Sequence, residues 1–149
     1  MAELVMSKDN SKEVLAALEN AKKRGLEAIG MTAERYAKIQ LSDAVYVEDP
    51  ERTWILTGRL RNSITYALSG EAPNITTYST DNGSETGTYE GTAPDDKEMA
   101  VYIGTNVVYA KGIELGTHRR KGAVHFLQSA AANHKDEYKN LLKQSMENA

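Results

Sequence analysis

The sequence lacks several features that mark particular classes of protein. Its 149 residues include no cysteine, which excludes a disulfide framework, thiolate catalysis and zinc or iron–sulfur sites built on cysteine. No apolar run approaches the roughly 18 residues that a membrane-spanning helix needs. The first residues have neither the basic region nor the apolar run of a signal peptide. We therefore expect an intracellular chain with no membrane partner.

Catalytic and metal-binding motifs are also lacking. Of the three histidines, His125 and His134 are nine positions apart, which is about 900° around a helix and places them on opposite faces. Asp95 and Asp96 are adjacent and would point to opposite sides of an extended chain. The sequence contains no G-x-S-x-G motif and no P-loop. We therefore expect no metal, no cofactor and no enzymatic activity.

Helical periodicity is present near both ends of the chain. In residues 11–41 and 124–147, apolar residues recur at steps of three and four, which predicts two amphipathic helices. Gly25 and Gly30 each cost about 1 kcal/mol relative to alanine in a helix, which leaves a break near either of them open. The predicted core-facing residues are Leu15, Leu18, Leu26, Ile29, Ala33 and Tyr36 in the first helix, and Leu127, Ala130, Ala131, His134, Tyr138, Leu141 and Leu142 in the second.

Strand patterns lie between these helices. After a polar, turn-like connection at 51–62, residues 62–69 alternate between larger apolar and small or polar side chains, which predicts a half-buried strand. Residues 99–110 are the most apolar stretch and predict a second strand, interrupted at Gly104. The order favours an α+β fold of two layers, with the terminal helices packed on a small, mainly antiparallel sheet. We expect one domain over residues 1–149.

Residues 70–98 form a polar arm between the two strands. Asn82-Gly83, flanked by β-prone residues, is a strong hairpin signal because both residues tolerate a positive φ. A protruding hairpin and a disordered surface loop both fit this composition. The arm has seven acidic residues and one lysine, whereas the remaining chain has 17 basic and 14 acidic residues. The net charge of −3 is therefore the sum of a slightly basic body and an acidic arm. Such an arm could pair with a basic neighbour or, if it lined a channel, keep DNA from binding to the channel wall.

A basic cluster precedes the last helix. Lys111, His118, Arg119, Arg120 and Lys121 lie close together in the sequence and could contact phosphate. The alternative function is therefore a small intracellular binding module for nucleic acid or phosphate-bearing ligands through residues 111–121.

Three segments occur in an order that resembles a known family. They are Thr57-Gly58-Arg59-Leu60-Arg61-Asn62-Ser63-Ile64, the stretch from Val101 to Ala110 leading into Ile113-Glu114-Leu115-Gly116-Thr117, and Phe126 at the start of the last helix. Together they resemble the minor tail-component family of long-tailed bacteriophages and prophages, whose members are tail completion, neck or head–tail joining proteins. The residues that match the family pattern are Thr57, Gly58, Leu60, Ser63, Ile64, Tyr109, Ala110, Glu114, Gly116, Thr117 and Phe126.

The resemblance implies a structural virion protein at the head–tail junction, assembled in the cytoplasm of a host bacterium. It would form a ring with itself, a hexamer by resemblance, between head-connector and tail-tube or tail-terminator proteins, with DNA only as passing cargo. We expect Tyr109 and Phe126 to anchor the last strand to the last helix, and Glu114 to pair with Arg59, Arg119 or Arg120 or across subunits. The arm is expected to become ordered on contact with a neighbour. The candidate interface residues are Tyr78, Asp81, Asn82, Gly83, Glu85, Tyr89, Arg119, Arg120 and Lys121.

Overall fold

The computed structural model describes residues 11–44, 58–94, 98–115 and 124–148. In chain order the elements are α1 (Ser11–Ala44), α2 (Arg59–Ser63), β1 (Thr65–Leu68), β2 (Asn74–Ser79), β3 (Thr86–Gly91), β4 (Val101–Gly104), α3 (Ala110–Leu115), α4 (Phe126–Ala132) and α5 (Lys135–Glu147).

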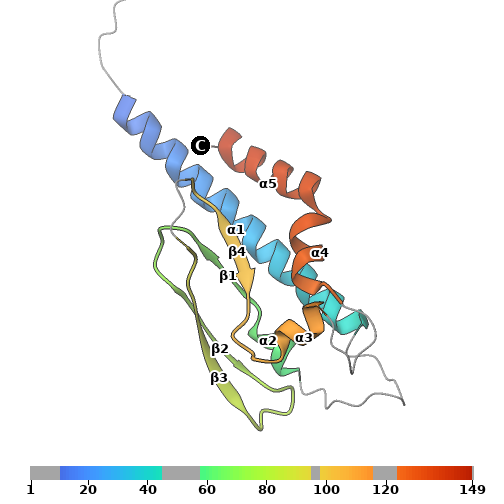
Figure 1. The fold of residues 1–149 in the computed structure, drawn as a ribbon. Coiled ribbons are helices and arrows are strands. Elements are labelled where there is room, and N and C mark those ends of the chain that lie inside the picture. The colour runs from blue at the N-terminus through green and yellow to red at the C-terminus, as the bar shows by residue number, and fades with distance from the viewer. Residues whose placement is uncertain (1–10, 45–57, 95–97, 116–123, 149) are drawn as a thin grey trace, which may run out of the picture.

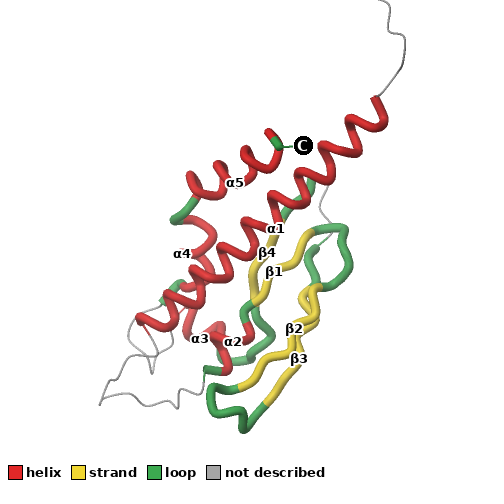
Figure 2. Tube along the Cα trace, turned by 180° about the vertical axis from the view of Figure 1, so that it is seen from behind, coloured by secondary structure: helices red, strands yellow, loops and turns green. Residues whose placement is uncertain are grey.

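The strands pair into two separate antiparallel ladders, β1 with β4 and β2 with β3. Helix α1 packs against the β1–β4 pair, and α4 and α5 lie along another side of α1 (Figure 1). The β2–β3 hairpin lies on the side of the β1–β4 pair that faces away from α1, α4 and α5, and it contacts the short helix α2 (Figure 2). The predicted α+β fold with antiparallel strands is confirmed, and its strands form two small sheets.

Helix α1 is continuous through both of its glycines. A Cβ atom at Gly25 would lie 2.7 Å from a methyl carbon of Leu142, and one at Gly30 would lie 2.8 Å from the ring of Tyr66. The glycines therefore do not break the helix. They let α5 and β1 approach the α1 backbone more closely than any side chain would allow.

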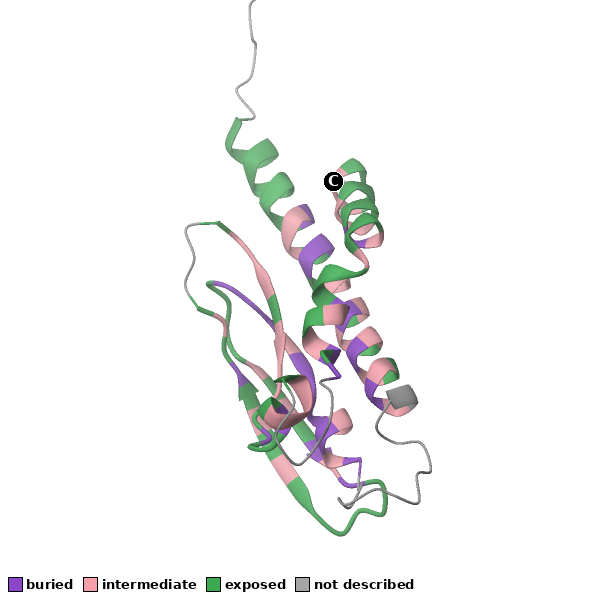
Figure 3. Ribbon diagram, turned by 45° about the vertical axis from the view of Figure 1, so that its right-hand side comes forward, coloured by how far each residue is buried: buried purple, intermediate pink, exposed green. Residues whose placement is uncertain are grey.

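The buried face of α1 starts later than its periodicity predicts. Its core positions are Ala21, Leu26, Ala33, Ala37 and Leu41. All residues from 11 to 20 are exposed, including the predicted core residues Leu15 and Leu18, as Figure 3 shows for this end of the helix. The reason is geometric, because the last turns of α5 reach only the level of Ala21, whose carbonyl accepts a hydrogen bond from Ser145 Oγ at 2.6 Å.

The segment around 59–69 differs from its prediction. Residues 59–63, expected to lie in the turn and the start of a strand, form the short helix α2, and β1 covers only Thr65–Leu68. The strand is also not half-buried, since Thr65, Ala67 and Leu68 are all buried. The hairpin covers the face that was expected to be in solvent, with Asn74 Nδ2 and Thr76 Oγ1 each 3.0 Å from Thr65 Oγ1.

The arm contains the predicted hairpin rather than a disordered loop over the residues described. Strand β2 pairs with β3 from Asn74 opposite Gly91 to Ser79 opposite Thr86. The connection is longer than a two-residue turn, because Thr80 N–H donates to Glu85 O at 2.9 Å, and Gly83 inside it has a φ of 72°. Tyr78 on β2 is buried in the main hydrophobic cluster. The hairpin therefore packs against the body of the protein and does not protrude from it.

The predicted strand 99–110 ends early. Strand β4 stops at Gly104, and Tyr109–Ala110, expected to be extended, lead into α3. Thr105 Oγ1 accepts a hydrogen bond from Val107 N–H at 3.1 Å, and Ala110 N–H donates to Val107 O at 3.1 Å. These local bonds turn the chain and compete with further ladder pairing.

The last helix is two helices instead of one. Helix α4 ends at Ala132 and α5 begins at Lys135, with Asn133 and His134 between them. Both residues have modest helix propensity. The His134 ring stacks on Tyr36 of α1, with ring centroids 3.6 Å apart. The break lets α4 and α5 each pack along α1.

Candidate functional site

The family-like residues converge on one place in the fold. Leu60 and Ile64 from the α2 segment, Ala110 at the start of α3 and Phe126 at the start of α4 are all buried in the same cluster. Leu41 of α1 and Tyr78 of β2 belong to the same cluster. The three motif segments are therefore neighbours in space, and each contributes buried apolar residues to the core.

Polar side chains tie these segments together. Ser63 Oγ donates to Leu60 O at 2.7 Å and lies 2.5 Å from Thr105 Oγ1. Tyr78 OH donates to Asn106 Oδ1 at 2.8 Å. Asn106 in turn donates to Thr88 O at 3.2 Å. The loop after β4 is thus bonded both to α2 and to the hairpin.

Gly58 shapes the entry into α2. Its φ of 83° lies in the left-handed region, and a Cβ atom there would collide with the carboxylate of Asp81. Its carbonyl accepts a hydrogen bond from Asn62 N–H at 2.9 Å. The glycine is therefore needed for both its backbone conformation and its lack of a side chain.

Asp81 joins the hairpin tip to α2. Its Oδ1 accepts hydrogen bonds from Arg61 Nη2 at 2.5 Å and Asn62 Nδ2 at 3.1 Å. The Asn62 bond and the Arg61 guanidinium hold the pKa of the Asp81 carboxyl below its usual value, because both favour the charged form. Arg61 and Asn62 are contacts that the sequence reasoning missed, since nothing in the sequence indicates which body residue meets the hairpin tip.

The acidic arm finds basic partners within its own chain. Besides Arg61 with Asp81, Lys23 Nζ lies 2.6 Å from Glu71 Oε1, and Arg59 Nη1 lies 3.8 Å from Glu85 Oε2. Each pair joins a body element to the segment around the hairpin. Three acidic residues of the arm, Glu71, Asp81 and Glu85, are therefore paired within the molecule, while pairing of the arm with a basic neighbour stays a prediction.

Glu114 caps a helix. Its two carboxylate oxygens accept hydrogen bonds from the backbone N–H groups of Leu127 at 2.8 Å and Gln128 at 3.0 Å. Both groups lie in the first turn of α4, where they have no partner within the helix. Of the arginines predicted as partners of Glu114, Arg59 contacts Glu85 instead, and Arg119 and Arg120 lie outside the described residues. Glu114 fastens the end of α3 to the start of α4.

The two aromatic anchors have different surroundings. Phe126 is fully buried and fulfils its predicted role in the core. Tyr109 is 49% exposed, Val108 beside it is 94% exposed, and Leu115 at the end of α3 is 60% exposed. Val108 and Leu115 line one shallow pocket beside α3, and we call these two residues the α3 apolar surface. The groups around the Tyr109 hydroxyl, Arg59, Tyr78 and Glu85, lie instead in α2 and the hairpin.

The candidate interface residues of the hairpin divide into two groups. Tyr78 is buried and bonded to Asn106, so its side chain contributes to the core rather than to a surface. Asn82, Gly83 and Glu85 are exposed near the tip, and Tyr89 is half-buried. The remaining predicted site residues, Thr57, Gly116, Thr117, Arg119, Arg120 and Lys121, lie outside the described residues.

The described residues were also compared with the requirements of a metal site and of a membrane-spanning helix. Within the described ranges, no three histidine, aspartate or glutamate side chains are grouped so that they could hold a metal ion. None of the described helices combines the length and apolar character needed to cross a membrane.

Comparison of the chain with protein-family models, curated proteins and solved structures gives no match.

Proposed function

We propose that this protein is a structural subunit that works by assembly, and that it serves at the head–tail junction of a long-tailed bacteriophage, as the resemblance of its three segments implies. The observation that carries the proposal is exposed apolar surface. Ten large apolar side chains of the described residues are exposed, and two groups of them are local. Exposed apolar groups of this kind mark interaction sites.

The first group is the start of α1, where Val14, Leu15 and Leu18 are 54%, 62% and 37% exposed. The second is the α3 apolar surface. The two groups belong to different elements, so one subunit can contact more than one neighbour. A subunit of a ring that also joins a head to a tail needs such separate surfaces.

Deleting the gene in a phage or prophage that carries it tests this function. We expect induced cells to accumulate filled heads and complete tails that are not joined, as seen by electron microscopy. Addition of the purified protein to such a lysate is expected to restore joined, infectious particles. Joined, infectious virions that lack the protein would overturn the proposal.

A further inference from the structure

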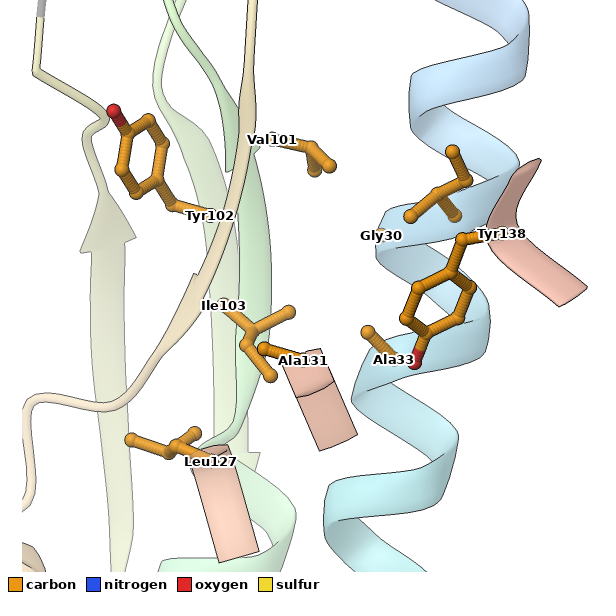
Figure 4. A pocket seen from close by; sticks show the side chains of 9 residues that line it. Gly30, Ala33, Val101, Tyr102, Ile103, Leu127, Ala131 and Tyr138 are labelled. Carbon is orange, nitrogen blue, oxygen red and sulfur yellow. The ribbon is translucent and has the colours of Figure 1, made fainter. Parts of the chain in front are cut away.

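An open apolar groove lies beside α1 in the middle of the molecule. It has a volume of about 440 Å³ and is lined by Ile29, Gly30 and Ala33 of α1, Ile103 of β4, and Leu127 and Ala131 of α4. Figure 4 shows Val101 and Ile103 directed toward α1, while Tyr102 points the other way. Ala131 is small and exposed on the α4 side of the groove, so a neighbouring side chain can come close there.

The groove also borders an unpaired strand edge. Among the described strands, β4 pairs only with β1. Ser69 N–H donates to Ala100 O at 2.9 Å. This bond shows which residues of the β1–β4 ladder have their backbone groups directed toward the partner strand. In the alternation of an antiparallel pair, the backbone groups of Val101 and Ile103 then point away from β1. Proteins protect such edges from unwanted pairing by covering them with a helix or a loop.

The same chain has a projecting apolar helix end, the start of α1, whose convex shape is complementary to the groove. The first turns of α1 are exposed on all sides. Val14 and Leu15 lie four and three positions before Leu18, so both share a face of the helix with it. We call these three residues the α1 knob. A helix end with one apolar face is the usual occupant of an apolar groove.

The α1 knob cannot enter the groove of its own molecule. Leu15 of the knob and Gly30 of the groove belong to one continuous helix and are separated by about 22 Å along its axis. A straight helix cannot fold back on itself. No other described segment covers either surface, so we expect the two to meet between different molecules.

We propose that the α1 knob of one copy of this chain packs into the groove between α1, β4 and α4 of a second copy. The contact uses a different surface on each partner, so it is heterologous and can repeat from copy to copy. Such a contact closes into a ring when the rotation between neighbouring copies adds up to a full turn. This inference rests on the proposed function in assembly, and it names the surfaces that make the contact between copies.

Sedimentation velocity and native mass spectrometry of purified variants test the contact. Leu15→Ser/Leu18→Ser removes the knob and leaves the groove intact. Ala131→Arg, at an exposed position on the groove wall, blocks the groove and leaves the knob intact. Each is expected to raise the dissociation constant between copies at least about tenfold, which is the effect of losing an interfacial hot spot. The matched control is Met31→Ser/Ile39→Ser, which changes two exposed apolar residues of the same helix and should leave assembly unchanged.

Mixing the two variants tests the asymmetry of the contact. The knob of the Ala131→Arg protein can still enter the groove of the Leu15→Ser/Leu18→Ser protein. We therefore expect a 1:1 complex that grows no further. A symmetric contact between like surfaces would give no complex and would overturn the proposal.

Two other outcomes would also overturn it. One is assembly of both variants with the affinity of the wild-type protein, and the other is a wild-type protein that stays monomeric at every concentration reached. Neither outcome alters the expectation of unjoined heads and tails after gene deletion. Failure of this contact and failure of the proposed function are thus separate results.

Discussion

Gly58 occupies a backbone conformation that residues with a side chain adopt only at a cost. Its φ is 83°, and Asp81 fills the space where a Cβ atom would lie. We expect Gly58→Ala to lower the free energy of unfolding by more than about 2 kcal/mol, since the left-handed conformation alone costs roughly 1–2 kcal/mol. Urea unfolding measures this loss. The matched control is Gly70→Ala, where φ is 73° but no atom lies within 4 Å, so only the conformational cost applies. Equal losses in the two variants would show that Asp81 does not fill this space.

Asp81 makes stability depend on pH. The pKa of its carboxyl is lower in the folded protein than in the unfolded chain, where the value is about 3.9. Its contribution is therefore fully present above the unfolded value and is lost as the pH falls through the folded value. We expect the stability advantage of the wild-type protein over Asp81→Asn, measured by denaturant unfolding, to be constant near neutrality and to shrink below about pH 4. Glu90→Gln on the same hairpin serves as the control. An advantage that is unchanged at pH 3 would contradict the assignment.

At the scale of elements, the glycines of α1 set how closely its neighbours pack. In an exposed helix, Gly→Ala stabilises by about 1 kcal/mol. We expect Gly30→Ala to destabilise instead, by roughly 1–3 kcal/mol, because the new Cβ would lie within 3 Å of three Tyr66 atoms, including its Cβ. Gly25→Ala should cost less, since its shortest contact is with the movable end of Leu142. Thermal unfolding compares them with Met31→Ala, an exposed change on the same helix that should be nearly neutral. A gain in stability for Gly30→Ala would refute the close contact.

The elements also show what could be predicted from the sequence. The helical period of residues 11–41 and the Asn82-Gly83 signal correctly indicated a long helix and a hairpin. The period could not show that α5 ends near Ala21 and leaves Leu15 and Leu18 exposed, because that depends on a partner 124 residues away in the chain. In the same way, the alternation in residues 62–69 could not reveal that the hairpin covers the second face of β1.

The candidate site was predicted in part, for a similar reason. The expected packing of Leu60, Ile64 and Phe126 into the core is seen, whereas Tyr109, expected to anchor the last strand together with Phe126, is 49% exposed. The hydrogen bonds of Glu114 to α4, and of Arg61 and Asn62 to Asp81, could not be foreseen, because each depends on how distant segments meet. Short polar turns such as Thr105 to Val107 also ended the last predicted strand, and local side-chain bonds of this kind have only a weak sequence signal.

For the whole molecule, the structure makes the hairpin part of the folded subunit. Tyr78 buries its ring in the core, and three ion pairs join the segment around the hairpin to the body. Exposed ion pairs contribute little, so we expect Tyr78 to supply most of the attachment. Hydrogen exchange on the isolated protein should show protected amides in β2 and β3. Tyr78→Ala should remove this protection and cost about 3–5 kcal/mol, as for other large aromatic truncations.

Tyr78→Phe is the control for packing. It keeps the ring and loses only the hydrogen bond to Asn106, so we expect a cost of about 1 kcal/mol and a protected hairpin. Hairpin amides that exchange freely in the wild-type subunit, and become protected only when partners are added, would instead support ordering of the arm on assembly.

The continuity of α1 has a mechanical consequence. A helix of 34 residues is about 51 Å long, and its glycines are wedged against Tyr66 and Leu142. The helix therefore moves as one rigid rod, so that its two ends move together. A tilt of the exposed turns before Ala21 would therefore also move the backbone at Gly25 and Gly30, against which α5 and β1 pack. A neighbour that binds this end of α1 could therefore change the packing around Gly25 and Gly30 at the centre of the molecule.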